Sequence, residues 1–187
     1  MNLNEVIKKR RSIRQFKSKK VHWEKILEAI DTSSKISLAG NINNLKFIII
    51  EKQETKNELA KNCQQYWIAD APIIIAVCSD ETKLERMYHE RGKIYSRQQV
   101  GAAIQNLILK LTELGLSTCW VGAYADELIK QILEIPEYIN LEAILPIGYP
   151  KGKTKLIKKT PLENLLNWEK WGKKKKPTNK KPEPATW

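Results

Sequence analysis

The sequence predicts a layered fold of helices and strands, in which one sheet is covered by helices on both faces. Uninterrupted apolar runs, typical of buried strands, alternate along the chain with stretches whose apolar residues recur at helical spacing. With 187 residues, 42% of them hydrophobic, the chain can bury a core of its own. We expect one folded domain over residues 1–172 and a lysine-rich, disordered tail over 173–187.

The first half of the chain is expected to supply helices and two buried strands. After a short amphipathic turn, a helix is predicted over 21–34, because its apolar residues recur at i, i+3, i+4 and i+7. The apolar run 47–50 predicts a strand. A polar helix over 53–65 and a second apolar strand over 72–78 follow.

The second half contains the longest helix and two further strands. A wide apolar stripe from Val100 to Leu114 predicts a buried helix that stops at Gly115. A third strand is expected over 117–121, and a helix capped by Asp126 comes next. The last strand is expected over 141–149.

Most of the net charge of +12 lies near the C-terminal end. Residues 151–187 contain 12 lysines and three glutamates, which gives this segment a net charge of +9. The segment lacks the interleaved aromatic residues on which nucleic-acid bases stack, so nucleic-acid binding is disfavoured. A solubilising or thermally adaptive charge excess explains it more simply.

The remaining composition favours a cytoplasmic protein without a metal. No apolar run reaches the roughly 18 residues that cross a bilayer, and no apolar signal segment follows the first charges. Cys63, Cys78 and Cys119 are far apart among apolar residues, which is typical of buried reduced thiols. Two histidines and no CxxC pair give a metal site no support.

The first cluster with evident chemistry is Arg10, Arg11, Ser12 and Arg14. Guanidinium groups offer a rigid fork of donors that matches phosphate, and the serine hydroxyl adds a neutral donor. The cluster could therefore hold a phosphate. Taken alone, these residues favour a simpler interpretation, either a solvated basic turn or a localisation or nucleic-acid patch, over a phosphate site.

Four segments become informative through their order and spacing. They are residues 10–14 (RRSIR), 39–47 (AGNINNLKF), 95–124 (YSRQQVGAAIQNLILKLTELGLSTCWVGAY) and 144–153 (ILPIGYPKGK), the last followed by KKTPLENLL. From Ile7 to about Trp171 the chain resembles the nitroreductase family of FMN-dependent oxidoreductases. The resemblance implies a three-layer α+β fold with a mixed, mainly antiparallel sheet. It also implies a homodimer with FMN at the interface and a C-terminal arm that packs on the partner subunit.

The resemblance assigns roles to the basic cluster. It implies that Arg10, Arg11 and Ser12 hold the FMN phosphate and ribityl chain. Arg14 is expected to approach the N1 and C2-carbonyl edge of the flavin, where a cation favours the negative charge that arrives with a hydride.

Six further positions match family ligands. Asn41 and Asn43 would hydrogen-bond the flavin from its other side, although asparagines in a loop also form Asx turns. A second segment would lie along the flavin and direct a backbone N–H at N5; it consists of Trp120, Val121 and Gly122. Lys159 stands where the family commonly has a phosphate-binding arginine, and a lysine is expected to make a looser contact. Without the resemblance, Trp120 reads as core, Gly122 as a break after a strand and Lys159 as an exposed lysine.

The chain also departs from the family pattern. The loop usually reads Asn-x-Gln-Pro-Trp in the family, whereas here Asn43 replaces the glutamine and Asn44 and Leu45 replace Pro-Trp. Gln99 stands where an aspartate often caps the long helix, a change expected to affect stability more than chemistry.

The implied activity is ping-pong hydride transfer from NADH or NADPH, through FMN, to an electron-poor acceptor such as a nitroaromatic or a quinone. No catalytic triad is required, because the flavin carries the chemistry. No GxGxxG follows a strand, so the nicotinamide would have to stack on the flavin directly. Two alternatives remain. One is a flavin enzyme of the same fold that performs dehalogenation or flavin fragmentation, although the chain is short between Asp80 and Tyr95, where a large lid would lie. The other is a basic nucleic-acid-binding protein.

Overall fold

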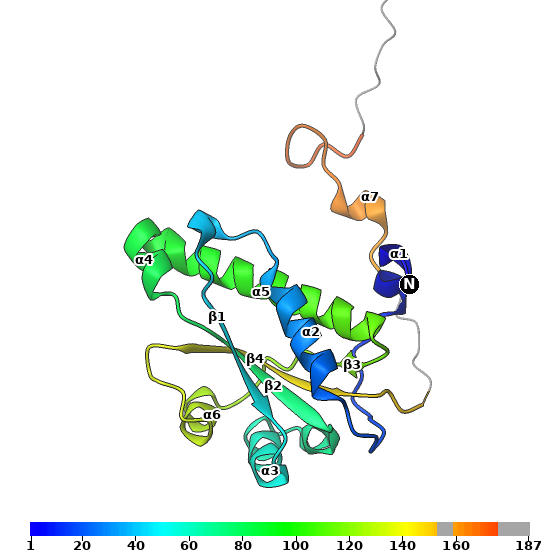
Figure 1. Cartoon of the computed structure of the whole chain (residues 1–187). Helices are drawn as coiled ribbons and strands as arrows, with labels where there is room; N and C mark the ends of the chain where they lie inside the picture. Colours follow the sequence, from blue (N-terminus) through cyan, green and yellow to red (C-terminus); the bar gives the residue numbers. More distant parts are fainter. Residues whose placement is uncertain (153–158, 176–187) are drawn as a thin grey trace, which may run out of the picture. The chain divides into compact units, whose positions relative to one another are not determined.

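A computed structural model describes residues 1–152 and 159–175 of the chain. Its residues group into two compact units, Met1–Thr154 and Lys155–Trp187, which are described separately. The sheet and all but one of the helices belong to the first unit (Figure 1).

A four-stranded sheet with strand order β1-β2-β4-β3 forms the centre of the first unit. The strands are β1 (Leu45–Ile50), β2 (Ile73–Ser79), β3 (Ser117–Thr118) and β4 (Asn140–Gly148), and neighbours are antiparallel throughout. A single parallel bridge joins Ser12 to Thr118. The predicted mainly antiparallel sheet is thus confirmed.

Helices cover both faces of the sheet, so the predicted three layers are present (Figure 1). Ile73, Ile75 and Val77 of β2 pack against α2 (Trp23–Ser34) and α5 (Glu90–Glu113). The alternate residues Ile74, Ala76 and Cys78 pack on the opposite face with α3 (Gln53–Asn62) and α6 (Asp126–Ile132). Successive side chains of a strand point to opposite faces, which is why a strand between two helical layers is apolar at every position.

The remaining elements of this unit are α1 (Leu3–Lys9), the 3-10 turns η1 (Ala39–Asn41) and η2 (Tyr66–Asp70), and α4 (Thr82–Tyr88). His89, with a left-handed φ of 52°, joins α4 to α5. At Gly92 a Cβ atom would lie 2.3 Å from the carbonyl oxygen of Leu84, so only glycine allows the two helices to meet this closely.

Three expectations from the sequence need correction. The strand expected over 117–121 comprises only Ser117 and Thr118, because the chain then leaves the sheet and returns for a single bridge between Val121 and Ile144. Asp126 is the first residue of α6 and caps nothing, since Ala125 occupies the cap position. Gln99 lies inside α5, not at its start, because that helix begins at Glu90.

The three cysteines are buried and free, as predicted. Burial raises the pKa of the Cys63 and Cys78 thiols to about 11.

The second unit contains one short helix, α7 (Leu162–Leu165). The side chains of Leu162, Leu165 and Trp171 are exposed, Trp171 to 93%. These residues belong to the predicted C-terminal arm, of which positions 156–158 lie outside the described residues. Of the predicted tail, only residues 173–175 are described.

Candidate functional site

The basic cluster lies on an extended segment that follows α1. Asn2 and Glu5 cap the start of α1 reciprocally, each side chain accepting a hydrogen bond of 3.0 Å from the other residue's backbone N–H. After α1 ends, the N–H of Ile13 donates to the carbonyl of Thr118 at 3.1 Å. Ile13 is buried, whereas Ser12 and Arg14 are exposed. The side chain of Ile13 therefore holds the segment against the core and leaves its two neighbours facing solvent.

The guanidinium groups of this segment are available to an anion. Arg11 Nη1 donates to the carbonyls of Lys8 and Arg10 at 2.7 and 2.6 Å, and the Arg14 guanidinium lies 6.0 Å from the ring centroid of Trp67. Among residues 1–152 and 159–175, no carboxylate forms an ion pair with Arg10, Arg11 or Arg14. Three cations without a counterion, beside a serine hydroxyl, suit a phosphate.

The predicted segment 120–122 lies at the same edge of the sheet, directly after the strand that pairs with Ser12. Trp120 is 43% exposed, and a Cβ atom on Gly122 would meet nothing within 4 Å. Val121 is buried, and its N–H donates to the carbonyl of Ile144 at 3.1 Å. That N–H is therefore occupied, and a backbone donor for a ligand would have to come from Trp120 or Gly122.

Sequence reasoning overlooked two residues of this region. Thr118 is buried, and its hydroxyl has no hydrogen-bond partner among the described residues. Trp67 contacts both Arg14 and Phe16. In the sequence, Thr118 could have been noticed only because it lies close to Trp120. No local pattern indicated a role for Trp67.

Asn41 and Asn43 occupy a separate loop. Gly40 and Asn41 both adopt left-handed φ values, 56° and 55°. Asn43 Oδ1 accepts a hydrogen bond of 3.0 Å from the N–H of Leu45, the Asx turn considered above, while its amide nitrogen makes no hydrogen bond within the described residues. Both side chains are exposed, so each can still meet a ligand.

The two groups of predicted ligands are held by different parts of the chain. The asparagine loop is bonded to Gln99, in the middle of α5, whereas the basic segment pairs with β3, which follows the end of α5 at Glu113. These two positions on α5 are separated by about 21 Å at the helical rise of about 1.5 Å per residue. Lys159 belongs to the second unit and is exposed.

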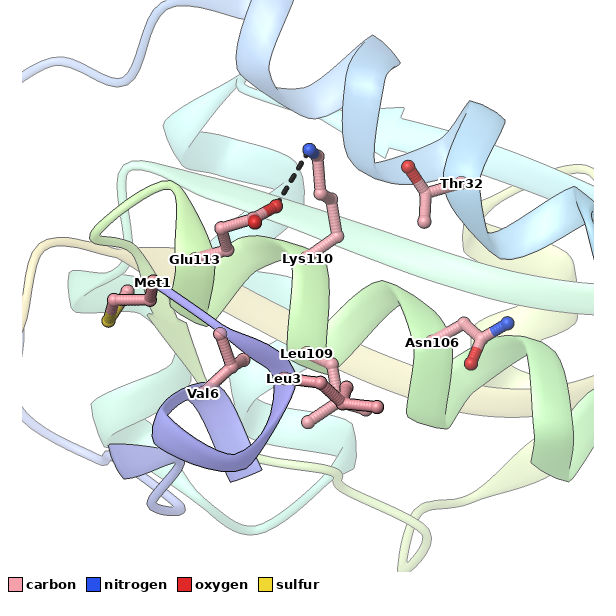
Figure 2. Close-up of a pocket in the computed structure, with 8 residues that line it drawn as sticks. All are labelled: Met1, Leu3, Val6, Thr32, Asn106, Leu109, Lys110 and Glu113. Atoms are coloured by element: carbon pink, nitrogen blue, oxygen red, sulfur yellow. Dashed lines mark hydrogen bonds and ion pairs between the residues drawn. The ribbon is translucent and has the colours of Figure 1, made fainter. Parts of the chain in front are cut away.

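A cavity of about 280 Å³ lies beside α1, between it and the end of α5 (Figure 2). Met1, Leu3, Val6 and Leu109 supply apolar lining, and Lys110 bonds Glu113 at 2.8 Å at its rim. Thr32 and Asn106 complete the lining. None of the predicted ligand residues lines this cavity.

The described residues contain no group of three histidine, cysteine, aspartate or glutamate side chains that could hold a metal ion. Shifted pKa values occur elsewhere in the fold. Burial lowers the pKa of Lys56, and burial followed by the nearby Asp126 and Glu142 carboxylates raises that of Tyr124. The predicted site is therefore a set of hydrogen-bond donors and positive charges.

No helix among the described residues is both long and apolar enough to span a membrane.

Comparison with known proteins identifies the family. The nitroreductase family model matches residues 7–65 and 59–149. A protein of Methanocaldococcus jannaschii, provisionally described as a nitroreductase, is 39% identical over 97 residues, which are 51% of this chain and 48% of that protein. A protein of Methanothermobacter thermautotrophicus, provisionally described as an NADH dehydrogenase/NAD(P)H nitroreductase, is 30% identical over 80% of this chain and 78% of its own length. Iodotyrosine deiodinase of Thermotoga neapolitana is 23% identical over 79% and 88%.

Solved structures agree on the fold. A nitroreductase family protein from Clostridium novyi superposes with a TM-score of 0.74 and 27% identity, covering 92% of this chain and 96% of that one. The NADPH:FMN oxidoreductase of Vibrio harveyi, complexed with NAD+, superposes with a TM-score of 0.83 and 18% identity over 91% and 78%. With its three-layer fold and a family match over most of its length, this chain belongs to the nitroreductase family.

Proposed function

We propose that this protein is an FMN-dependent oxidoreductase that transfers a hydride from NADH or NADPH to an electron-poor acceptor such as a nitroaromatic or a quinone. The observation that carries the proposal is the cluster of Arg10, Arg11, Ser12 and Arg14, which has no acidic partner among the described residues, beside a segment 120–122 in which Trp120 and Gly122 are exposed. A phosphate at the arginines and a flat ring along Trp120 and Gly122 would use both features. The buried free thiols suit work in the reducing cytoplasm.

Bound FMN would supply hydride acceptance and two-electron transfer. The residues of the chain would bind and orient it. Arg10, Arg11 and Ser12 would neutralise and hydrogen-bond the phosphate. Arg14, whose guanidinium is steadied by the ring of Trp67, would stabilise negative charge on the flavin edge. Trp120 or Gly122, whose backbone N–H groups donate no hydrogen bond within the described residues, would offer the N–H that Val121 cannot.

We further propose a homodimer in which each site takes residues from both subunits. Two observations support it. The asparagine loop is bonded to Gln99 in the middle of α5, whereas the basic segment pairs with β3, which follows the end of α5; these two positions on the helix are about 21 Å apart. Between Arg97 and Lys110, α5 also carries no charged residue, although it presents exposed Gln98, Ala102 and Gln105. In a two-fold interface the same face meets itself, so the middle of one helix can approach the end of its partner.

The C-terminal arm would complete the dimer. Leu162, Leu165, Leu166 and Trp171 are exposed apolar side chains within a short stretch, which is unusual for a segment in water. Packing on the partner subunit would remove them from solvent.

Cofactor analysis tests the proposal. The purified protein should be yellow, and heat should release one FMN per subunit, identified on a column against FAD and riboflavin standards. Under anaerobic conditions NADH or NADPH should bleach the flavin absorbance, and a nitroaromatic or quinone should restore it. A colourless protein that also fails to bind added FMN would refute the proposal.

A second reaction on the same cofactor has specific support. The similarity to the deiodinase of Thermotoga neapolitana extends over most of both chains, so reductive dehalogenation is the alternative chemistry. Halide release from a halogenated phenol, measured beside nitroaromatic reduction, separates the two. The link between β2 and α5 holds only the seven-residue helix α4, which leaves little chain for a large lid and favours the reductase.

A further inference from the structure

The loop that carries Asn41 and Asn43 has an unusual backbone and close neighbours. Gly40 and Asn41 adopt consecutive left-handed φ values, which glycine adopts freely and asparagine more readily than other side chains. A Cβ atom at Gly40 would lie 2.8 Å from the hydroxyl of Tyr88, so α4 closes the loop from one side.

A buried polar network closes it from the other side. Gln99 Oε1 accepts from the N–H of Ala39 at 2.7 Å, and Gln99 Nε2 donates to the carbonyl of Ile42 at 3.2 Å and to Asn44 Oδ1 at 2.8 Å. Asn44 Nδ2 then donates to Ser96 Oγ at 2.7 Å. Asn44, Ser96 and Gln99 are exposed to only 2%, 0% and 5%.

Gln99 bonds the loop on both sides of the two asparagines and between them. Its partner Ala39 precedes Asn41, Ile42 lies between Asn41 and Asn43, and Asn44 follows Asn43. The carbonyl of Asn44 also accepts from the N–H of Asp80 at 2.8 Å, which ties the loop to the end of β2. Every polar atom of the Gln99 amide is used, the condition under which a buried polar group fixes one conformation.

Asn44 and Gln99 are also two of the positions at which this chain departs from the family pattern, and they bond to each other. An ionised aspartate at position 99 is only an acceptor and could not donate to the Ile42 carbonyl or to Asn44 Oδ1. A proline at position 44 would offer no amide to Gln99 or Ser96. The two residues are chemically matched.

We infer that Gln99 and Asn44 are positioning residues, which set the loop so that Asn41 and Asn43 meet the flavin in the right geometry. The inference rests on the proposed function. Neither residue touches the cofactor, because both side chains are buried and fully engaged with the loop and with Ser96.

The test compares Gln99→Met, which keeps the length of the side chain but removes its hydrogen bonds, with Thr112→Val. Thr112 is also buried on α5 and donates to the carbonyl of Ile108 at 2.8 Å, but it forms no hydrogen bond with the loop, so it controls for loss of a buried polar group. Ser96→Ala removes only the hydrogen bond between Asn44 and Ser96, and it replaces Gln99→Met in the test if that variant does not fold.

Two readouts are measured on dimeric protein: hydrogen exchange of backbone amides 39–45 without flavin, and the Kd for FMN by fluorescence titration. Gln99→Met should accelerate loop exchange and weaken FMN binding at least about tenfold, whereas Thr112→Val should change neither by more than about twofold. With Asn44→Leu added, the Kd should change little more than in Gln99→Met alone, because both substitutions break one network.

The outcomes separate the two claims. If the parent protein binds no FMN, the proposed function fails, while loop exchange still reports whether the network holds the loop. If the parent binds FMN and Gln99→Met binds it equally well, the positioning role is refuted whatever the exchange shows. Equal losses in Gln99→Met and Thr112→Val would likewise refute it, because the effect would then be general destabilisation.

Discussion

A subunit-mixing experiment tests whether the flavin site is shared between two chains. One variant carries Arg10→Glu, which places a carboxylate where the phosphate is expected. The other carries Asn41→Gly and Asn43→Asp. Glycine tolerates the left-handed backbone at position 41, and aspartate keeps the oxygen that accepts from Leu45 N–H while removing the amide donor. Each variant alone should therefore fold but bind FMN poorly.

The arrangement of the two ligand groups determines how much FMN binding the mixture of variants should recover. If the basic segment of one chain and the loop of its partner make one site, a mixed dimer contains one intact site and one doubly altered site. Random pairing of equal amounts gives mixed dimers in about half of the population, so about a quarter of all sites should recover FMN binding. If both ligand groups act within one chain, no site is intact and recovery is zero.

The assay is FMN bound per subunit after co-expression of the two variants. Mixing Arg10→Glu with Arg11→Glu is the matched control, because both lie on the basic segment and every mixed dimer then has two altered sites. Zero recovery in the first mixture, with subunit exchange verified by mass spectrometry, would refute the shared site.

Three further predictions concern Arg14, the C-terminal arm and Lys56. Arg14→Ala should lower the flavin reduction potential by about 30 to 60 mV, as expected when a charge-assisted contact of about 1.5 to 3 kcal/mol is lost from a two-electron couple; an unchanged potential with weaker FMN binding would reduce Arg14 to an anchor. Ending the chain after Pro150 should give aggregated or flavin-free protein, whereas ending it after Gly172 should change little; a yellow, monomeric short form would refute the role of the arm. Lys56→Met should cost about 1 to 3 kcal/mol of unfolding free energy, because Lys56 Nζ donates to the buried carbonyl of Ala71 at 2.8 Å. Burial lowers the pKa of Lys56 below its ordinary 10.5, so between these two pH values the unfolded chain binds more protons than the folded chain. The free energy of unfolding of the parent should therefore rise with pH in this range, relative to that of Lys56→Met. Urea unfolding at two alkaline pH values measures this trend, and the opposite trend would show that the ammonium is favourably paired.

The sequence predicted the layers of the fold because burial on both faces leaves a direct mark on a strand. Every residue of β2 is buried, and its sequence is apolar without interruption from Ile73 to Cys78. The start of α5 left no such mark. Its residues from Glu90 to Arg97 are mostly exposed and polar, so the apolar stripe shows only the helix from Val100 onward.

The site was predictable only as far as its chemistry is local. The basic segment 10–14 can be recognised from its composition alone. In the structure it lies beside residues 118–122 because its backbone pairs with Thr118. The network around Gln99 joins residues 52 to 60 positions apart, and neither segment contains a pattern that predicts contact with the other. The same holds for the contact between Arg14 and Trp67, which depends on η2 folding back toward the start of the chain.

The bridge between Ser12 and Thr118 also protects the sheet. β3 is an edge strand of two residues, and an uncovered edge offers its backbone groups to the strands of other molecules. The segment that presents the arginines lies along this edge and occupies the Thr118 carbonyl. Loss of this pairing would therefore expose the backbone of β3 to other molecules, and a phosphate that ordered the basic segment, as proposed, would also keep this edge of the sheet covered.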